Sequence, residues 1–376
     1  MSGRVRTDSG PFRTGFGRAS CHHGEILQGV FRDARGRGCA GLVTLPVHGP
    51  GSRAVFVPAP GARPGEVTVR PAGREKARRA AALMVRECVR TPGVRACGGE
   101  VRIAGGLPVG LGLGSSSSDV VAALRAVADA FGVHPSPGTL ARLAVRAERA
   151  CDPLMLDGRP VLFAQREGRV LEVFGEVLPP VVVVGCALGG GAPVDTLSLP
   201  APRTACTAEL DTYGELRELL RRAVRTGDPV LLGRVATESA RLGQRSFHRP
   251  EFAALQEAAR RVGAVGVQIA HSGSVAGLLL DARGFGAVPA GPEPEDAGAL
   301  GCGWPGQVRT AVRVLGDLGM PAARVFTTHR TPAPSPSPSV PSHIAFEESS
   351  HGHAHSGIDR PTGSGPARRG AALPAL

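Results

Sequence analysis

The chain has 376 residues, of which 42% are hydrophobic, so it can bury a large core and two domains are expected. Its formal net charge is +12, but aromatic residues make up only 4% and the arginines are scattered along the chain. This composition argues against stacking on single-stranded nucleic acid, while a basic cleft for a phosphorylated ligand is compatible with the charge.

The cysteines and the first residues bear on the cellular compartment. The eight cysteines form no Cys-x-x-Cys pair and show no spacing typical of zinc sites. The first residues lack the apolar core of a secretory signal, and no segment has the length and hydropathy of a membrane span. Widely spaced cysteines in such a chain predict reduced thiols, a cytoplasmic location and no membrane partner.

In the first half of the chain, short strands and amphipathic helices are expected after an irregular arm. The strands are predicted at residues 41–47, 53–59, 66–72 and 99–103, where apolar runs lie between prolines and glycines. Helices are predicted at 75–90, from an N-cap at Ser118 to about Phe131, and at 140–150.

The second half begins with a wholly apolar run that predicts a buried strand. The predicted elements are a strand at 179–188, helices at 215–227 and 250–263, a strand–turn–strand unit at 263–282, a helix at 307–319 and a strand at 323–328. Strands and helices interleave without regular alternation, which favours an α+β fold. From Arg330 onward the chain is rich in Pro, Ser, Gly and His, which predicts a disordered tail.

The stretch Pro108–Asp119 reads PVGLGLGSSSSD and leads directly into a predicted helix. Glycine-rich backbone, serine hydroxyls and a helix N-terminus together suit a nucleoside triphosphate with Mg²⁺. A Walker A loop is excluded because Lys76 is the only lysine, and no Gly-x-Gly-x-x-Gly dinucleotide fingerprint is present. Taken alone, the stretch fits a glycine turn before a serine-capped helix equally well.

Three motifs in order resemble those of the GHMP kinases, the superfamily of galactokinase, homoserine, mevalonate and phosphomevalonate kinases. Residues 108–117 resemble the P-x-x-x-G-L-G-S-S-A signature, with Ser117 in place of the usual alanine. ASCHHGEILQG (19–29) resembles the first family motif, and GAVGVQIAHSGSVAGLLLD (263–281) resembles the third. Within the superfamily, the segments 21–29, 151–153 and 271–273 resemble the L-threonine kinase branch of cobalamin side-chain synthesis.

The resemblance implies a two-domain α+β fold. A ribosomal-S5-like N-terminal domain is expected over residues 15–178 and a ferredoxin-like C-terminal domain over 179–330. An irregular arm (1–14) would precede them, and the disordered tail (331–376) would follow.

The resemblance also implies roles for individual residues. The residues expected to hold ATP are Pro108, Gly110, Gly112, Gly114, Ser115, Ser116 and Ser117. Mg²⁺ would be held by Ser116 and Glu148, and the catalytic set would be Ser116, Glu148 and Asp152. The residues expected to contact the acceptor are His23, Glu25, Gln28, His271, Ser272 and Gly273.

Glu148 and Asp152 stand four residues apart at the end of a predicted helix, which would place both carboxylates on one face. Glu148 would then complete the Mg²⁺ shell, and Asp152 would orient or deprotonate the acceptor hydroxyl. The glycine-rich spacer usual between these acids is missing, so the division of roles is open, and a solvated charged surface is the alternative. His22 and His23 are not expected to bind metal, because adjacent side chains point in different directions.

The implied reaction is transfer of the γ-phosphate of ATP to the hydroxyl of a small amino acid or amino alcohol, with L-threonine as the expected acceptor. Homoserine kinase or a secondary-metabolite kinase is an alternative within the family. A catalytically inactive ligand-binding protein of the GHMP fold is the alternative of a different functional class, and an RNA-binding protein would need basic and aromatic clusters that the sequence lacks. The expected partner is thus a small-molecule substrate, with no nucleic acid, and the sequence leaves a homodimer open.

Overall fold

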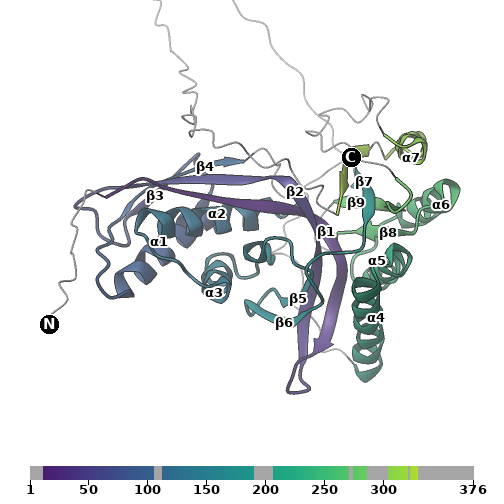
Figure 1. Cartoon of the computed structure of the whole chain (residues 1–376), viewed down its shortest axis with the longest axis horizontal. Helices are drawn as coiled ribbons and strands as arrows, with labels where there is room; N and C mark the ends of the chain where they lie inside the picture. Colours follow the sequence, from purple (N-terminus) through teal and green to yellow (C-terminus); the bar gives the residue numbers. More distant parts are fainter. Residues whose placement is uncertain are drawn as a thin grey trace, which may run out of the picture. The chain divides into compact units, whose positions relative to one another are not determined.

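The computed structural model describes residues 12–105, 112–189, 206–270, 274–285, 304–320 and 322–328. These residues form two sheets (Figure 1). The first contains β1 (Gly15–Arg32), β2 (Gly38–Pro58), β3 (Val67–Arg70), β4 (Gly99–Gly105), β5 (Val161–Ala164) and β6 (Arg169–Val173). The second contains β7 (Val181–Ala187), β8 (Gly266–Ile269), β9 (Val275–Asp281) and β10 (Ala322–Thr327).

The long strands β1 and β2 pair with each other along their length and are the spine of the first sheet. Residues 52–58 of β2 also pair with β4, whereas Leu42, near the start of the strand, pairs with Phe163 of β5. The segments 41–47 and 53–59, expected as two strands, are therefore parts of one strand. Long-range pairing with two different neighbours carries the strand through the Pro and Gly residues that predict a break.

Three helices lie on one face of the first sheet: α1 (Glu75–Arg90), α2 (Ser115–Ala130) and α3 (Pro137–Glu148) (Figure 1). Helix α1 confirms the predicted span 75–90 and buries Met84, Val85 and Cys88 from its apolar stripe. The predicted N-cap at Ser118 is wrong, because the N-cap of α2 is Gly114, four residues earlier. Ser118 is buried instead, and its hydroxyl donates to the carbonyl of Ala19.

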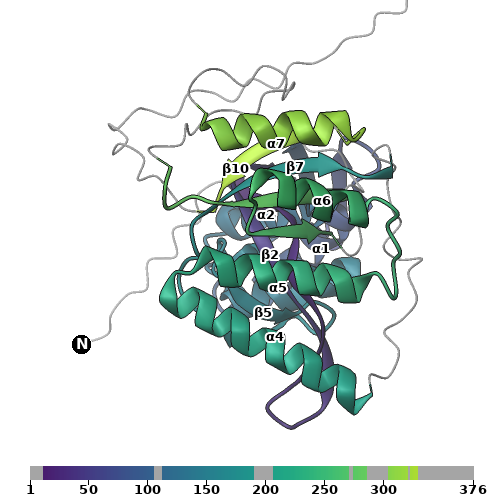
Figure 2. The ribbon, with the colours of Figure 1, turned by 90° about the vertical axis from the view of Figure 1, so that its right-hand side faces the viewer.

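The second sheet has the strand order β10-β7-β9-β8 and is antiparallel throughout. Helices α6 (Phe252–Val262) and α7 (Gly306–Asp317) pack on one of its faces (Figure 2). With one of these helices before β8 and the other before β10, this is the β-α-β-β-α-β arrangement of the ferredoxin-like fold. The apolar strand β7 is buried on both sides, because alternate valines face these helices and the core built on β1.

Between β7 and β8 the structure has one helix more than expected. Alongside α4 (Thr207–Thr226) and α6 lies α5 (Pro229–Gly243), which packs between α4 and β8. Its signal is local: the Asp228 side chain accepts the N–H groups of Val230 and Leu231, and Pro229 occupies the first helical position. Only Gly227 and Asp228 separate α4 from α5, and because of this short interval α5 was not predicted as a separate helix.

No helix in the described part of the chain has the length and apolar character needed to cross a membrane. Both sheets fall within a single unit of contacts, residues 1–332. The domain boundary expected between residues 178 and 179 therefore stays a prediction.

Helix α5 approaches β8 closely where Gly233 of the helix faces Gly266 of the strand. A Cβ on Gly233 would lie 2.2 Å from the carbonyl oxygen of Val265, so we expect Gly233→Ala to lower the free energy of unfolding by about 1–3 kcal/mol through overpacking. In the matched control Gly214→Ala, in α4, the new Cβ would meet no atom within 4 Å, and higher helix propensity should raise stability by up to about 1 kcal/mol. Urea unfolding of both variants measures the difference, and equal effects would contradict this packing.

Candidate active site

The first motif and the glycine-serine stretch meet through backbone hydrogen bonds. Strand β1 departs from regular register between His22 and Leu27, where it bulges. Within this bulge the N–H groups of His22 and Gly24 donate to the carbonyls of Leu113 and Gly112, at 3.3 and 3.1 Å. These bonds fix the approach of β1 to the start of α2.

Gly114 closes the glycine-serine stretch in a left-handed conformation, with φ 68°, and serves as the N-cap of α2. A Cβ at this position would lie 2.3 Å from Cδ2 of His22, so both the backbone and the histidine ring require glycine. The first N–H groups of a helix have no acceptor within the helix, so those following Gly114 are available to an anion. Pro108 and Gly110 lie outside the described residues.

Glu148, the last residue of α3, is buried, with 2% of its side chain exposed. Ser116 and Ser117 in the first turn of α2 donate their hydroxyls to its two carboxylate oxygens, at 2.9 and 2.8 Å. The ammonium of Lys76 lies 3.8 Å from Oε2. Burial raises the pKa of Glu148, and Lys76 and Ser117 offset part of that effect. The structure thus joins the two residues predicted to hold Mg²⁺.

Asp152 does not share a helix face with Glu148, so that part of the sequence-based interpretation is wrong. Helix α3 ends at Glu148, and Arg149 turns the chain with a left-handed φ of 70°. Ser117 nevertheless links the two acids. Its hydroxyl oxygen accepts a hydrogen bond from the N–H of Asp152 at 3.2 Å, and its O–H donates a hydrogen bond to the carboxylate of Glu148. The loop, rather than helical spacing, brings the acids together.

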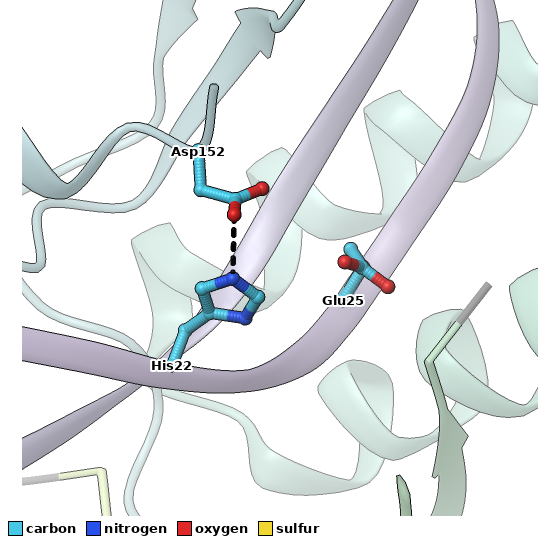
Figure 3. A group of neighbouring side chains, drawn as sticks. All are labelled: His22, Glu25 and Asp152. Carbon is cyan, nitrogen blue, oxygen red and sulfur yellow. Dashed lines mark ion pairs between the residues drawn. The ribbon is translucent and has the colours of Figure 1, made fainter. Parts of the chain in front are cut away.

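His22 pairs with Asp152, and Glu25 lies beside them (Figure 3). Nε2 of His22 is 2.9 Å from Oδ2 of Asp152, and its Nδ1 is 3.1 Å from the carbonyl of Gly24. Burial by itself lowers the pKa of His22, but Asp152 and Glu25 outweigh it and raise the pKa to about 9. Burial also raises the pKa of Asp152, yet His22 holds it below its usual value.

His22, Glu25 and Asp152 offer ligand atoms within 4.8 Å of one another, close enough to surround a metal ion. With no metal bound, the pKa of His22, about 9, keeps its imidazole protonated at neutral pH, and His22 and Asp152 form an ion pair. No sequence pattern predicts this pairing, because His22 and Asp152 are 130 positions apart and the orientation of His22 depends on a bulge in β1.

Two residues predicted to bind the acceptor make structural contacts. Nδ1 of His23 lies 3.0 Å from Oε1 of Gln268, and burial lowers the pKa of His23 to about 4, so its ring is neutral. The N–H of Gln28 donates to the hydroxyl of Ser239 at 3.1 Å. Acceptor contact by these residues and Glu25 stays a prediction. The other predicted acceptor residues, His271, Ser272 and Gly273, lie outside the described part of the chain.

A polar network that was not predicted from the sequence anchors α2. The Asp119 carboxylate accepts the hydroxyl of Ser52 at 2.5 Å and pairs with Arg74 at 2.7 Å. Because Asp119 is buried and lies one turn beyond Ser115, this network fixes the start of α2 against β2 and the residue preceding α1.

The donor set suits a hard divalent cation. Carboxylate and hydroxyl oxygens are typical ligands of Mg²⁺, and here they come from Glu148 and Ser116 at the positive end of a helix. Burial penalises the ionised form of Glu148, and a cation bound there would stabilise it. The residues present therefore fit Mg²⁺ with an anionic ligand at the start of α2.

The ion pair of His22 has a pH signature. The folded-state pKa of His22, about 9, is above the ordinary histidine value of 6.5, so the stabilisation is complete below about pH 6 and is lost as the pH rises through about 9. We expect the stability advantage of wild type over His22→Gln to shrink by up to about 3 kcal/mol between these limits. Urea unfolding in a chelator across that range measures it. The matched control is His134→Gln, which changes an exposed histidine outside this cluster, and a pH-independent difference for His22→Gln would contradict the assignment.

Family models match two parts of the chain. The model of the GHMP kinases N terminal domain matches residues 75–155, and that of the GHMP kinases C terminal domain matches residues 216–288. An L-threonine kinase of Salmonella typhimurium is 27% identical over 197 residues, which cover 49% of this chain and 60% of the relative. An L-threonine kinase of Citrobacter freundii is 27% identical over 188 residues, again 60% of its length. The chain thus spans less than two thirds of these curated relatives.

Solved structures share the fold. A homoserine kinase from Cytophaga hutchinsonii superposes with a TM-score of 0.57 at 16% identity, covering 87% of this chain and 97% of that one. A phosphomevalonate kinase from Streptococcus pneumoniae superposes with a TM-score of 0.56 at 14% identity, covering 84% and 99%. Together with the two matched family models, these likenesses confirm the predicted two-domain fold with mixed α and β elements.

Proposed function

We propose that the chain is a GHMP kinase, an ATP-dependent enzyme that phosphorylates the hydroxyl of a small amino acid or amino alcohol, with L-threonine as the expected acceptor. The matches of residues 75–155 and 216–288 to the models of the N- and C-terminal domains of that family support the proposal. The observation that carries the proposal is the buried Glu148 carboxylate held by two serines at the N-terminus of α2, with ionised Asp152 beside it. The likeness to two L-threonine kinases supports the choice of acceptor.

In this proposal the start of α2 binds the phosphates of ATP, and Ser116 and Glu148 hold Mg²⁺. The metal, when bound, supplies positive charge that offsets charge on the transferred phosphoryl group. The backbone N–H groups after Gly114 orient the phosphate oxygens. Phosphoryl transfer depends largely on such positioning and charge stabilisation, so this set is suited to it.

In this proposal Asp152 interacts with the acceptor substrate. Its low pKa keeps it ionised, so it can accept a hydrogen bond from the acceptor hydroxyl and orient it. His22 holds the carboxylate in place and stays protonated. Asp152 is also the more exposed of the two acids, with 21% of its side chain accessible against 2% for Glu148, as an acceptor site requires.

We also propose that the protein is cytoplasmic. The thiols of Cys88, Cys97 and Cys186 are free and buried, which is typical of a reducing compartment. The sequence analysis leaves a homodimer open.

Substitution of the two acids separates their roles. Glu148→Gln should raise the Mg²⁺ concentration needed for half-maximal rate and lower turnover, because a neutral amide is a weaker ligand. Asp152→Asn should leave binding of Mg·ATP nearly intact and lower turnover, by about a hundredfold or more if Asp152 is a general base. Steady-state kinetics across a Mg²⁺ titration measure both effects.

The control is Asp157→Asn, which changes an exposed acid in the same loop, 73% accessible and paired with Arg125. Asparagine tolerates the left-handed backbone of that position, so this variant should match wild type. If Glu148→Gln and Asp152→Asn also match wild type in turnover and metal response, the proposed active site is misplaced.

The acceptor is identified by coupling ADP release to a panel of alcohols. L-threonine should give the highest kcat/KM among threonine, homoserine, serine, ethanolamine and mevalonate. Preference for homoserine would identify the protein as a homoserine kinase instead. ATP binding without turnover on any member of the panel would favour an inactive relative.

A further inference from the structure

The only lysine of the chain faces the candidate active site. Lys76 is the single lysine among 44 basic residues, and it is the second residue of α1. Its side chain is one third exposed, and its ammonium lies 3.8 Å from Oε2 of Glu148. Every other basic side chain of these 44 is an arginine, so the lysine stands where a compact charge on a flexible stem meets the buried carboxylate.

The contact between Lys76 and Glu148 is loose. At 3.8 Å it is an ion pair without hydrogen-bond geometry, and Oε2 already accepts the hydroxyl of Ser116. Within the described residues Glu148 is its one ion-pair partner. The charge of Lys76 also acts on Asp152, whose ionised form it favours. The ammonium therefore lies beside Glu148 without a hydrogen bond to it, and its charge also reaches Asp152.

Occupation of the metal site would displace this ammonium. A divalent cation on Glu148 would take the oxygen that Lys76 now faces, and two cations at that distance repel each other strongly in a partly buried site. The nearest alternative anion would be the phosphate chain held at the start of α2. The four-carbon stem of lysine allows such a shift, whereas a planar guanidinium fits it poorly.

We propose that Lys76 is a catalytic residue whose ammonium exchanges Glu148 for a phosphate oxygen of bound Mg·ATP and offsets charge during phosphoryl transfer. This inference rests on the proposed kinase function. A structural role, in which Lys76 only compensates the buried charge of Glu148, would keep the ammonium at Glu148 throughout.

Because no other lysine exists, an amine reagent tests the proposal directly. The amines that trinitrobenzenesulfonate can modify are Lys76 and the terminal amine, and peptide mapping separates these two from each other and from arylated thiols such as that of exposed Cys206. Mg²⁺ alone should not slow modification of Lys76, whereas Mg·ATP at ten times its Kd should slow it about tenfold. The terminal amine is the internal control and should react at a constant rate.

Calorimetry on the same samples keeps failure of this inference distinct from failure of the proposed function. Mg·ATP that binds without protecting Lys76 overturns the inference and leaves the kinase assignment standing. No binding of Mg·ATP at all contradicts the kinase assignment itself, and the inference with it.

Variants supply the second readout. Lys76→Met should lower kcat by about a hundredfold with little change in KM for the acceptor, since it removes one charge-stabilising group. Lys76→Arg should recover only part of that loss. The matched control Arg79→Met changes an exposed residue of the same helix and should keep wild-type kinetics. Lys76→Met with wild-type kcat, or with a loss confined to thermal stability, would assign Lys76 a structural role.

Discussion

The buried carboxylate of Glu148 is the constraint on which the rest of the site depends. An ionised group in this position is costly unless donors surround it, and the donors here are the hydroxyls of Ser116 and Ser117. To present both hydroxyls, α2 must begin at Ser115, and Gly114 makes that start by its left-handed turn. The same geometry directs the free N–H groups of the helix towards the region that an anionic ligand would fill.

The two acids have opposite environments. Burial raises the pKa of Glu148, whereas the imidazolium of His22 keeps that of Asp152 low. Pairs of titratable groups with pKa values moved apart are typical of sites that divide chemical roles. Ser117 couples the pair, because one hydroxyl serves the carboxylate of Glu148 and the backbone of Asp152. In the proposed function, the metal-binding acid and the acceptor-orienting acid would therefore be adjacent without sharing a ligand.

Strand β1 brings the two sheets to this site. The bulge at Gly24 donates a backbone hydrogen bond to Gly112, and a Cβ on Gly24 would lie 2.2 Å from Nε2 of Gln268 in β8. Gly24 has a φ of +63°, so the close approach and the backbone conformation both require glycine. The first motif thus touches the second motif on one side and the first strand of the third motif, β8, on the other.

Amphipathic periodicity in the sequence predicted helix α1, because that pattern is local. The resemblance of three motifs to those of the GHMP kinases implied the ferredoxin-like half and the joint role of Ser116 and Glu148. The sequence by itself did not determine the continuity of β2, since that depends on pairing with two distant strands. Only the tertiary structure paired His22 with Asp152 and placed Lys76 beside Glu148. The partners are 130 and 72 positions apart in the sequence. Their side chains are oriented by the bulge in β1, the loop after α3 and the first turn of α1. No periodicity in the chain encodes such directions, because they arise when separate elements pack together.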